Sequence, residues 1–404
     1  MRSFAYVGSV GVWASWLSGC SKDVSFDRDT SPSPSDSTGS HTSYTGPSTS
    51  STHVRTTTMT PRSTVAPDSN CPGKRLGQYS WGTDLWREGS TEFSGFFGSQ
   101  AGKDWGCGDI YINIGDYTAP TVIAFEEDLV PFIQGYREAS SNWESVVWLT
   151  YGDVESNDGS LMSVFVDTFF NWAGALSVDT VETLGSIGLS FDVEHMDPAS
   201  TKIALKKAQS LKESTNFQPG TLLVQHTIEG RVNSEGTDYV MKYADSALMM
   251  LYRNYMESST FNSDSNILSR AAFMLKDQCV HCLDDDYAIA NYNAKLTIMI
   301  EASCNETDYC GKISFCAHDT KGADYAWSVL QELETGMFSS GLVTPDQFDR
   351  LFNPLTTYAV HDWYWFRCYE PLSDSVSYSS CANYHSAAQT CRETISTVST
   401  TPSP

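Results

Sequence analysis

Short runs rich in β-branched and aromatic residues alternate with helical stretches along the chain from residue 71 to residue 391. This alternation predicts strands joined by helices, and therefore a parallel sheet. The expected strands are residues 75–81, 110–116, 146–153, 187–194, 222–228, 247–255, 296–303 and 358–366. Eight strands are the number that closes a (β/α)8 barrel. We therefore predict an α/β protein with a single TIM-type barrel domain over residues 71–391.

Apolar residues at helical spacing are clearest between the third and fourth expected strands. They recur on one helix face at Met162, Phe165, Val166, Phe169, Phe170 and Trp172. A single apolar stripe of this kind is typical of a helix that packs against a barrel. Residues 204–213 interleave Lys and Glu with Leu and Ala, which predicts a second helix with a solvated face.

The two ends of the chain lack this pattern. Residues 1–20 carry Arg2 followed by an apolar stretch, which is typical of a secretory signal peptide. The string Leu-Ser-Gly-Cys at residues 17–20 also matches a bacterial lipoprotein cleavage site, so a lipid anchor at Cys20 is an alternative. Residues 21–70 are a Ser/Thr/Pro-rich linker expected to be disordered and O-glycosylated, and residues 392–404 are a disordered tail. We expect a secreted, extracellular protein.

The composition narrows the class of partner. The chain has 404 residues and a net charge of −24, and 40% of its residues are hydrophobic. The negative charge argues against nucleic acid or an anionic membrane surface, because both are bound through clustered Lys and Arg. After the leader, no run of about 18 apolar residues offers a membrane span. The barrel is large enough to bury its own core, so we predict a monomer.

The cysteines indicate disulfides rather than a metal site. Removal of Cys20 with the leader leaves an even number, as expected of a disulfide-bonded secreted domain. These are Cys71, Cys107, Cys279, Cys282, Cys304, Cys310, Cys316, Cys368, Cys381 and Cys391. Cys279 and Cys282 have the spacing of half a zinc site, but no second pair completes it, which favours a disulfide loop. The three aspartates at 284–286 favour a solvated turn over a calcium loop. We expect no metal and no cofactor. The string Asn-Glu-Thr at residues 305–307 is a glycosylation acceptor.

The residues that carry chemistry gather in the fourth expected strand, where alternation separates two faces. The face expected against the helices is Ile187, Leu189, Phe191 and Val193, and the inward face is Gly188, Ser190, Asp192 and Glu194. Buried carboxylates are costly, and barrel enzymes assemble their sites at the carboxyl ends of the strands. A functional pair is therefore favoured over the alternatives, which are a salt-bridged pair or a chance Asp-x-Glu string.

Two carboxylates on one strand face suit the cleavage of a glycosidic bond. Glu194, nearest the mouth, is the expected general acid if burial and a neighbour raise its pKa. Asp192, one step deeper, would be that neighbour. Like charges so close together resist double ionisation, and the pair can hold a proton near neutral pH.

At this strand the chain resembles the chitinase-like glycoside hydrolases of family 18, whose signature is Asp-Gly-x-Asp-x-Asp-x-Glu. Gly188, Asp192 and Glu194 match the signature, whereas Ile187 and Ser190 replace its first two aspartates. The flanking strings Phe-Val-Asp at 165–167 and Asp-Pro at 197–198 are also similar to that family. The resemblance implies that Glu194 is the general acid and that Asp192 orients a substrate N-acetyl group, which attacks the anomeric carbon. It also implies that Ser190 changes the charge state of Asp192, so a lectin-like relative with weak or no activity is an alternative.

The sixth expected strand carries a weaker match. The string Met-Leu-Tyr-Arg at residues 250–253 resembles the family's Met-x-Tyr-Asp string. Met250 and Tyr252 match it, and Arg253 takes the place of the aspartate. The resemblance implies that Tyr252 holds the acetamido carbonyl of the sugar. The alternative is a buried tyrosine with a satisfied hydroxyl.

Aromatic residues on the eighth and first expected strands are candidates for sugar contact. His361, Trp363 and Trp365 fall on one face of the eighth strand, and the resemblance implies that one tryptophan floors a sugar subsite. Tyr79 and Trp81 on the first strand are similar candidates. Core packing would produce the same pattern in both places.

Asp153 and Glu301 are the remaining carboxylates at expected strand ends. Either could complete an ordinary pair of acid and nucleophile, which would act on plain glucans. The leading hypothesis is a glycosidase that cleaves β-linked N-acetylglucosamine-containing oligo- or polysaccharides. A non-catalytic sugar-binding barrel and a glucan hydrolase are the alternatives.

Overall fold

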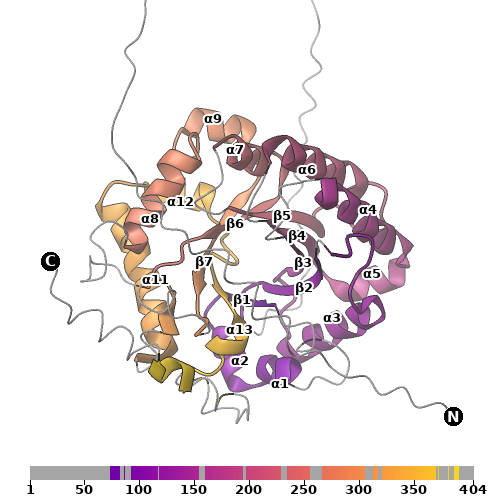
Figure 1. The fold of residues 1–404 in the computed structure, drawn as a ribbon, viewed down its shortest axis with the longest axis horizontal. Coiled ribbons are helices and arrows are strands. Elements are labelled where there is room, and N and C mark those ends of the chain that lie inside the picture. The colour runs from indigo at the N-terminus through magenta and orange to yellow at the C-terminus, as the bar shows by residue number, and fades with distance from the viewer. Residues whose placement is uncertain are drawn as a thin grey trace, which may run out of the picture. The chain divides into compact units, whose positions relative to one another are not determined.

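Eight parallel strands close into one barrel in the order of the chain, from β1 through β8 and back to β1 (Figure 1). The strands are β1 (Leu76–Ser80), β2 (Ile110–Asp116), β3 (Val147–Asp153), β4 (Ile187–Val193), β5 (Leu222–Ile228), β6 (Ser246–Met250), β7 (Lys295–Glu301) and β8 (Tyr358–His361). The computed structural model describes residues 73–81, 86, 92–116, 118–153, 160–193, 197–228, 234–254, 266–304, 313–316, 321–369, 372, 381 and 386–390. The predicted single-domain (β/α)8 barrel is confirmed. The predicted signal peptide, linker and tail lie outside the described residues.

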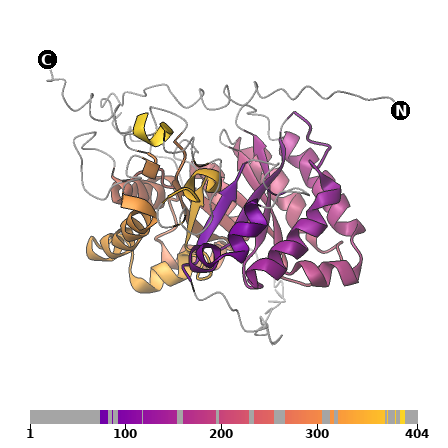
Figure 2. The ribbon, with the colours of Figure 1, turned by 90° about the horizontal axis from the view of Figure 1, so that it is seen from below.

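Helices surround the ring of strands, and the side view shows the strands running between them (Figure 2). They are α1 (Glu92–Gly98), α2 (Gln100–Trp105), α3 (Glu126–Ser140), α4 (Ser160–Ala175), α5 (Val178–Leu184), α6 (Pro198–Lys212), α7 (Ser234–Tyr243), α8 (Ile267–Phe273) with the π-helical turn η4 (Met274–Gln278), α9 (Asp285–Asn291), α11 (Gly322–Ser339), α12 (Pro345–Leu351) and α13 (Trp363–Phe366). Taken singly, none of the described helices has both the length and the apolar composition to cross a membrane. The helices Leu161–Ala175 and Val178–Leu184, which meet at a bend, together have that length and that composition.

Both helices expected from apolar spacing are present. α4 buries the predicted stripe, which includes Phe165 and Phe169, against the barrel. α6 contains most of the expected residues 204–213 and begins earlier, at Pro198. The Asp197 side chain accepts a hydrogen bond from the Ser200 N–H at this helix start, which satisfies one of the unpaired N–H groups there.

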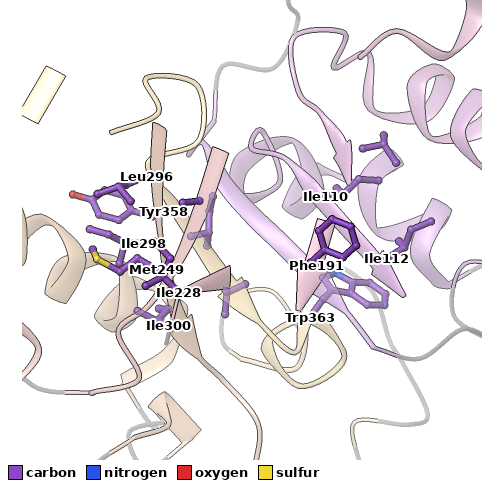
Figure 3. Close-up of a cluster of buried hydrophobic side chains, with 14 of the residues drawn as sticks. Ile110, Ile112, Phe191, Ile228, Met249, Leu296, Ile298, Ile300, Tyr358 and Trp363 are labelled. Atoms are coloured by element: carbon purple, nitrogen blue, oxygen red, sulfur yellow. The ribbon is translucent and has the colours of Figure 1, made fainter. Parts of the chain in front are cut away.

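Apolar side chains form two layers, one on each side of the strands. The outer layer packs between the strands and the helices, and Figure 3 shows part of it, including Ile112 of β2, Phe191 of β4 and Ile300 of β7. A smaller cluster fills the barrel interior with Tyr79, Tyr111, Val146, Trp148, Leu248, Met250, Met299 and Ala359. The lumen is therefore packed with side chains, as expected for a barrel of this strand number.

The alternation predicted for the fourth strand is confirmed over β4. Ile187, Leu189, Phe191 and Val193 lie in the outer layer against the helices. Ser190 and Asp192 hydrogen-bond to side chains of other strands and thus face the lumen. Glu194 lies outside the described residues.

The eighth strand is shorter than the sequence predicts. β8 ends at His361, where Asp362 adopts a left-handed φ of 66° and turns the chain into α13. Trp363 is 0% exposed and its ring centre lies 5.6 Å from that of Phe96 in α1. Trp365 is 7% exposed and belongs to the same outer layer. The prediction that these tryptophans share one strand face with His361 is wrong, because the strand ends before them.

Disulfides join Cys279 to Cys282, Cys304 to Cys316, and Cys368 to Cys381. Cys107 is disulfide-bonded as well. The preference for a disulfide over half a zinc site at residues 279–282 is therefore confirmed. The three aspartates that follow are the start of α9, where Asp284 caps the Tyr287 N–H and Asp285 pairs with Arg350.

Candidate active site

Asp192 lies in the barrel lumen near the carboxyl end of β4. It is 2% exposed. The hydroxyl of Tyr79 on β1 donates a hydrogen bond to Oδ2 at 3.1 Å, and the hydroxyl of Thr227 on β5 lies 3.0 Å from Oδ1. Side chains from β1 and β5 thus hold this carboxylate in place.

Burial raises the pKa of Asp192 above its usual range. The positive charge of His361 and the hydrogen bonds from Thr227 and Tyr79 act in the opposite direction and limit the rise. Burial thus favours the neutral form of the carboxyl group, whereas these three neighbours favour its charged form.

Glu301 and His361 form a second pair in the lumen, at the ends of β7 and β8. The strand register places the two residues opposite one another. His361 Nδ1 lies 2.7 Å from Glu301 Oε2. The other carboxylate oxygen, Oε1, accepts the backbone N–H groups of Ala302 and Ser303 at 2.9 and 2.8 Å. Glu301 is thus engaged on both oxygens.

This pair shifts the pKa of each partner toward the charged form. Burial alone would lower the pKa of His361, but the charge and hydrogen bond of Glu301, with the charges of Asp362 and Asp192, raise it to about 9. Burial would raise the pKa of Glu301, but the charge and hydrogen bond of His361 hold it below its usual range. The two side chains therefore support an ion pair inside the barrel.

Aromatic rings gather around this pair. The ring centre of Tyr79 lies 5.1 Å from those of Trp81 and His361, and the ring centre of Tyr252 lies 5.7 Å from that of His361. The indole N–H of Trp81 donates to His361 Nε2. Gly152 on β3 leaves room for the Trp81 ring, since a Cβ there would lie 2.7 Å from the indole. Trp81 and Tyr252 are half-buried, so part of each residue remains exposed.

Ser190 lies one step deeper on the same face of β4. Its hydroxyl donates to Gln225 Oε1 at 2.9 Å, and Gln225 Nε2 donates to the Ser246 hydroxyl at 2.9 Å. The single proton of Ser190 is therefore committed to β5. Met250 is buried in the interior cluster, and the Arg253 guanidinium donates to the carbonyl of Tyr252.

The amino end of the lumen holds another buried carboxylate, that of Asp109. Its oxygens accept the Val146 N–H and the Trp148 indole N–H, each at 2.9 Å. Trp148 also fills the space beside Gly188, where a Cβ would lie 2.3 Å from the indole. The matching glycine in the fourth-strand string thus has a packing role at this end of the barrel.

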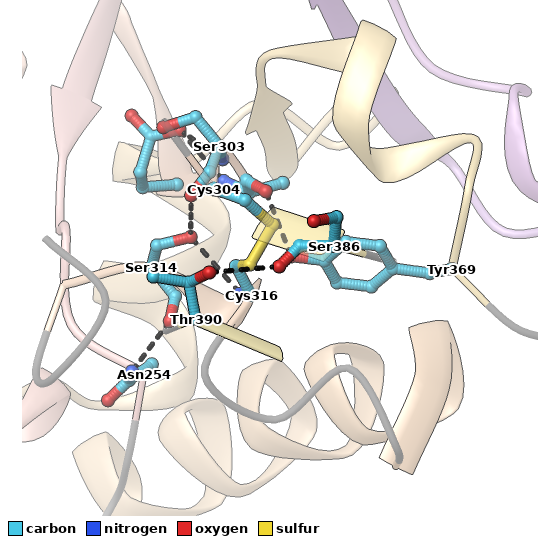
Figure 4. Close-up of a disulfide and its surroundings, with 10 residues drawn as sticks. Asn254, Ser303, Cys304, Ser314, Cys316, Tyr369, Ser386 and Thr390 are labelled. Atoms are coloured by element: carbon cyan, nitrogen blue, oxygen red, sulfur yellow. Dashed lines mark hydrogen bonds between the residues drawn. A yellow bond between two sulfur atoms is a disulfide. The ribbon is translucent and has the colours of Figure 1, made fainter. Parts of the chain in front are cut away.

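A disulfide stabilises the segment that supports Glu301 (Figure 4). Cys304 is bonded to Cys316, and the Ser314 hydroxyl donates to the Ser303 carbonyl at 2.6 Å. The Asn254 side chain donates to the Ser314 carbonyl at 2.6 Å. The backbone N–H of Ser303, which binds Glu301, is therefore fixed by a covalent link and by a residue that follows β6.

The structure brings together five of the twelve predicted site residues at the carboxyl end of the lumen, where sites of this fold are built. They are Asp192, Tyr79, Trp81, Tyr252 and Glu301. Trp363 and Trp365 lie on the other side of the strands. Glu194 and the side chain of Asp153 are not among the described parts of the chain.

Sequence reasoning missed the contributions of His361 and Thr227 to the site. Glu301 and His361 come from adjacent expected strands, but the end of the strand at His361 was not predicted. Within the described ranges, no group of three or more His, Cys, Asp or Glu side chains is arranged to hold a metal ion.

No family model matches the chain, and no curated protein matches it either. Among solved structures, it is similar to the spore cortex-lytic enzymes SleL of Bacillus megaterium and Bacillus cereus. Each has 11% sequence identity and a TM-score of 0.33, covering 57% of this chain and 51% of the other. The chain thus spans about half the length of these enzymes. It is also similar to the xylanase-α-amylase inhibitor protein XAIP-I, in complex with trehalose, with 14% identity and a TM-score of 0.39 over 78% of this chain and 99% of that one. Likenesses of this size say nothing about activity.

Proposed function

We propose that the protein is a chitinase-like glycoside hydrolase that cleaves β-linked N-acetylglucosamine-containing glycans. The observation that carries the proposal is the carboxylate of Asp192, which is buried yet held inside the lumen at the carboxyl end of β4. Sites of barrel enzymes are built at this end. Glu194 comes two residues later in the sequence, immediately after the last residue of β4.

In this mechanism Glu194 protonates the leaving oxygen, and Asp192 orients the N-acetyl group that attacks the anomeric carbon. Tyr79 and Thr227 fix the direction of the Asp192 carboxylate through their hydroxyl groups. The half-buried rings of Trp81 and Tyr252 supply surfaces suited to the apolar face of a pyranose. Both oxygens of Glu301 are engaged, which disfavours it as the nucleophile of a plain-glucan hydrolase.

The decisive experiment compares the parent protein with Glu194→Gln on chitooligosaccharides of defined length, with product detection by mass analysis. Loss of a general acid typically costs about 10²- to 10⁴-fold in rate, and the amide keeps the size of the side chain. We expect product from the parent and a loss of that size in the variant. Equal rates in the two proteins would exclude Glu194 as the acid.

One observation favours a second candidate, a sugar-binding barrel without turnover. Ser190 donates its proton to Gln225, so the residue below Asp192 offers neither a second carboxylate nor a shared proton. Calorimetry that detects glycan binding while mass analysis detects no product would favour this candidate. Measurable product release would reject it.

We also propose that the protein is secreted and meets its glycan outside the cell. The disulfides among the described cysteines support an oxidising compartment. Detection of the protein in culture medium, with its amino terminus cleaved near residue 20, would test this directly.

A further inference from the structure

The buried carboxylate of Asp192 needs a compensating charge. Its two hydrogen-bond donors are the neutral hydroxyls of Tyr79 and Thr227. Removing a carboxylate from water costs several kcal/mol unless a cation or strong donors offset it. Ser190, the next inward residue on β4, donates to Gln225 and contributes no charge.

His361 is placed to supply that charge. Its ring packs against Tyr79 with ring centres 5.1 Å apart, and the hydroxyl of the same tyrosine donates to Asp192. The influence is mutual, because the charge of His361 lowers the pKa of Asp192 and the charge of Asp192 raises that of His361. Tyr79 thus contacts both His361, through its ring, and Asp192, through its hydroxyl.

Glu301 sustains the charge on His361. Its carboxylate is held by the N–H groups of Ala302 and Ser303, so it is fixed in direction, and it faces Nδ1 of the imidazole. A buried histidine without such a partner is expected to be neutral. When His361 is protonated on both ring nitrogens, the row Glu301, His361 and Asp192 alternates negative, positive and negative charge across the lumen.

We propose that the Glu301–His361 pair controls the charge of Asp192. Within β4, Asp192 has no second carboxylate beside it that could do so. His361 and Glu301 are then positioning residues of the site. The proposal rests on the proposed function for its catalytic consequence, whereas the charge coupling itself can be measured without turnover.

Several groups face His361 and act on it in different directions. Glu301 on β7, Asp192 on β4 and the adjacent Asp362 favour its charged form. Tyr79 and Tyr252 present their rings to it. Trp81 acts in the opposite direction, because an indole N–H only donates and its contact with Nε2 requires a lone pair there. Removal of the indole therefore favours the imidazolium.

The test is an NMR titration of the imidazole of His361 in the full-length protein, assigned by its absence in His361→Gln. In the parent, the ring is expected to titrate at about pH 9. Glu301→Gln is expected to lower this pKa by the largest amount, since burial is then opposed only by the charges of Asp362 and Asp192. Asp192→Asn is expected to lower it by a smaller amount, and Trp81→Phe to raise it. An identical pKa in the parent and in Asp192→Asn would overturn the proposal.

A second readout separates this role from a structural one. In His361→Gln, loss of the positive charge raises the pKa of Asp192, so the acidic limb of the kcat/KM profile is expected to move to higher pH. A merely structural role would lower the whole profile without moving its limbs. His281→Gln is the matched control, because His281 stacks on Tyr287 beside α9, away from the lumen.

The two readouts distinguish the failure of each proposal. If the parent releases no product but Asp192→Asn still lowers the pKa of His361, the glycosidase proposal fails and the charge coupling stands. If the parent is active and the limb of the pH profile is unmoved in His361→Gln, the coupling proposal fails alone.

Discussion

Two aspartates lie buried inside the same barrel, one at each end, and their partners differ in kind. Asp109, at the amino end, accepts hydrogen bonds from the Val146 N–H and the Trp148 indole N–H, groups that can only donate, and the Thr356 hydroxyl is a further partner. Asp192, at the carboxyl end, is held by two hydroxyls, which can rotate to donate or accept. Burial raises the pKa of both.

The difference separates a structural carboxylate from one suited to chemistry. Two partners of Asp109 can only donate, one to each carboxylate oxygen, and they tie the start of β2 to β3 and to the Trp148 ring. The partners of Asp192 tolerate a change in its protonation or orientation, and a histidine that can itself titrate lies close by. A site that moves protons requires the second kind of environment.

The largest expected effect comes from placing the same amide at both positions. In Asp109→Asn, the amide NH₂ replaces an oxygen that accepts either the Val146 N–H or the Trp148 indole N–H, so one buried donor loses its acceptor and we expect a loss of about 2–3 kcal/mol in unfolding free energy. In Asp192→Asn, a hydroxyl can rotate to accept from the amide, so we expect a loss of about 1 kcal/mol or less. Urea unfolding of the two variants measures both values. Equal losses would contradict the comparison.

The pH dependence of stability is the next test, and its sign follows from the Glu301–His361 pair. The pKa of His361 is raised from 6.5 to about 9 on folding, so its contribution is complete below pH 6.5 and is lost as pH rises through 9. A shift of this size corresponds to about 3 kcal/mol. The pKa of Glu301 is lowered, so its contribution is lost as pH falls below its usual range.

We therefore expect the unfolding free energy of the parent to fall between pH 6.5 and 9 by more than that of His361→Gln. Urea unfolding at a series of pH values gives the difference between the two curves. Parallel curves across that interval would show that folding does not raise the pKa of His361.

The smallest expected difference is between the stability costs of an alanine at two inward glycines, Gly188 and Gly152. An alanine Cβ at 188 would lie 2.3 Å from the Trp148 indole, which is fully buried and bonded to Asp109. We expect Gly188→Ala to cost about 2–3 kcal/mol, because this ring has nowhere to move. At 152 the obstacle is Trp81, which is half-buried and can shift toward the mouth. Gly152→Ala should cost about 1 kcal/mol and weaken sugar binding. Thermal unfolding and calorimetry of both variants check this ordering.

The sequence was sufficient to predict the barrel and the inward face of β4. Strand alternation holds from Ile187 to Val193 because the apolar residues of this strand all pack on the outer face, which leaves Ser190 and Asp192 for the lumen. Eight such runs, each followed by a helix, leave few topologies other than a closed barrel.

The end of the eighth strand could not be predicted in the same way. Trp363 and Trp365 continue the alternation of His361, and short aromatic runs are equally compatible with a strand or a buried helical turn. The left-handed backbone at Asp362 decides between them, and nothing in the local pattern marks that residue. The Glu301–His361 pair was missed for another reason, since its partners come from different strands and meet only through the register of β7 and β8.

The most direct test of the account is the rate of product release from an N-acetylglucosamine oligosaccharide by the parent and by Asp192→Asn, with folding of both verified by their unfolding curves. We predict that the variant keeps its stability within about 1 kcal/mol and loses turnover by about 10²-fold or more. A variant that is equally stable and hydrolyses the substrate at the parent's rate would contradict the claim that the carboxyl end of this barrel is a catalytic site.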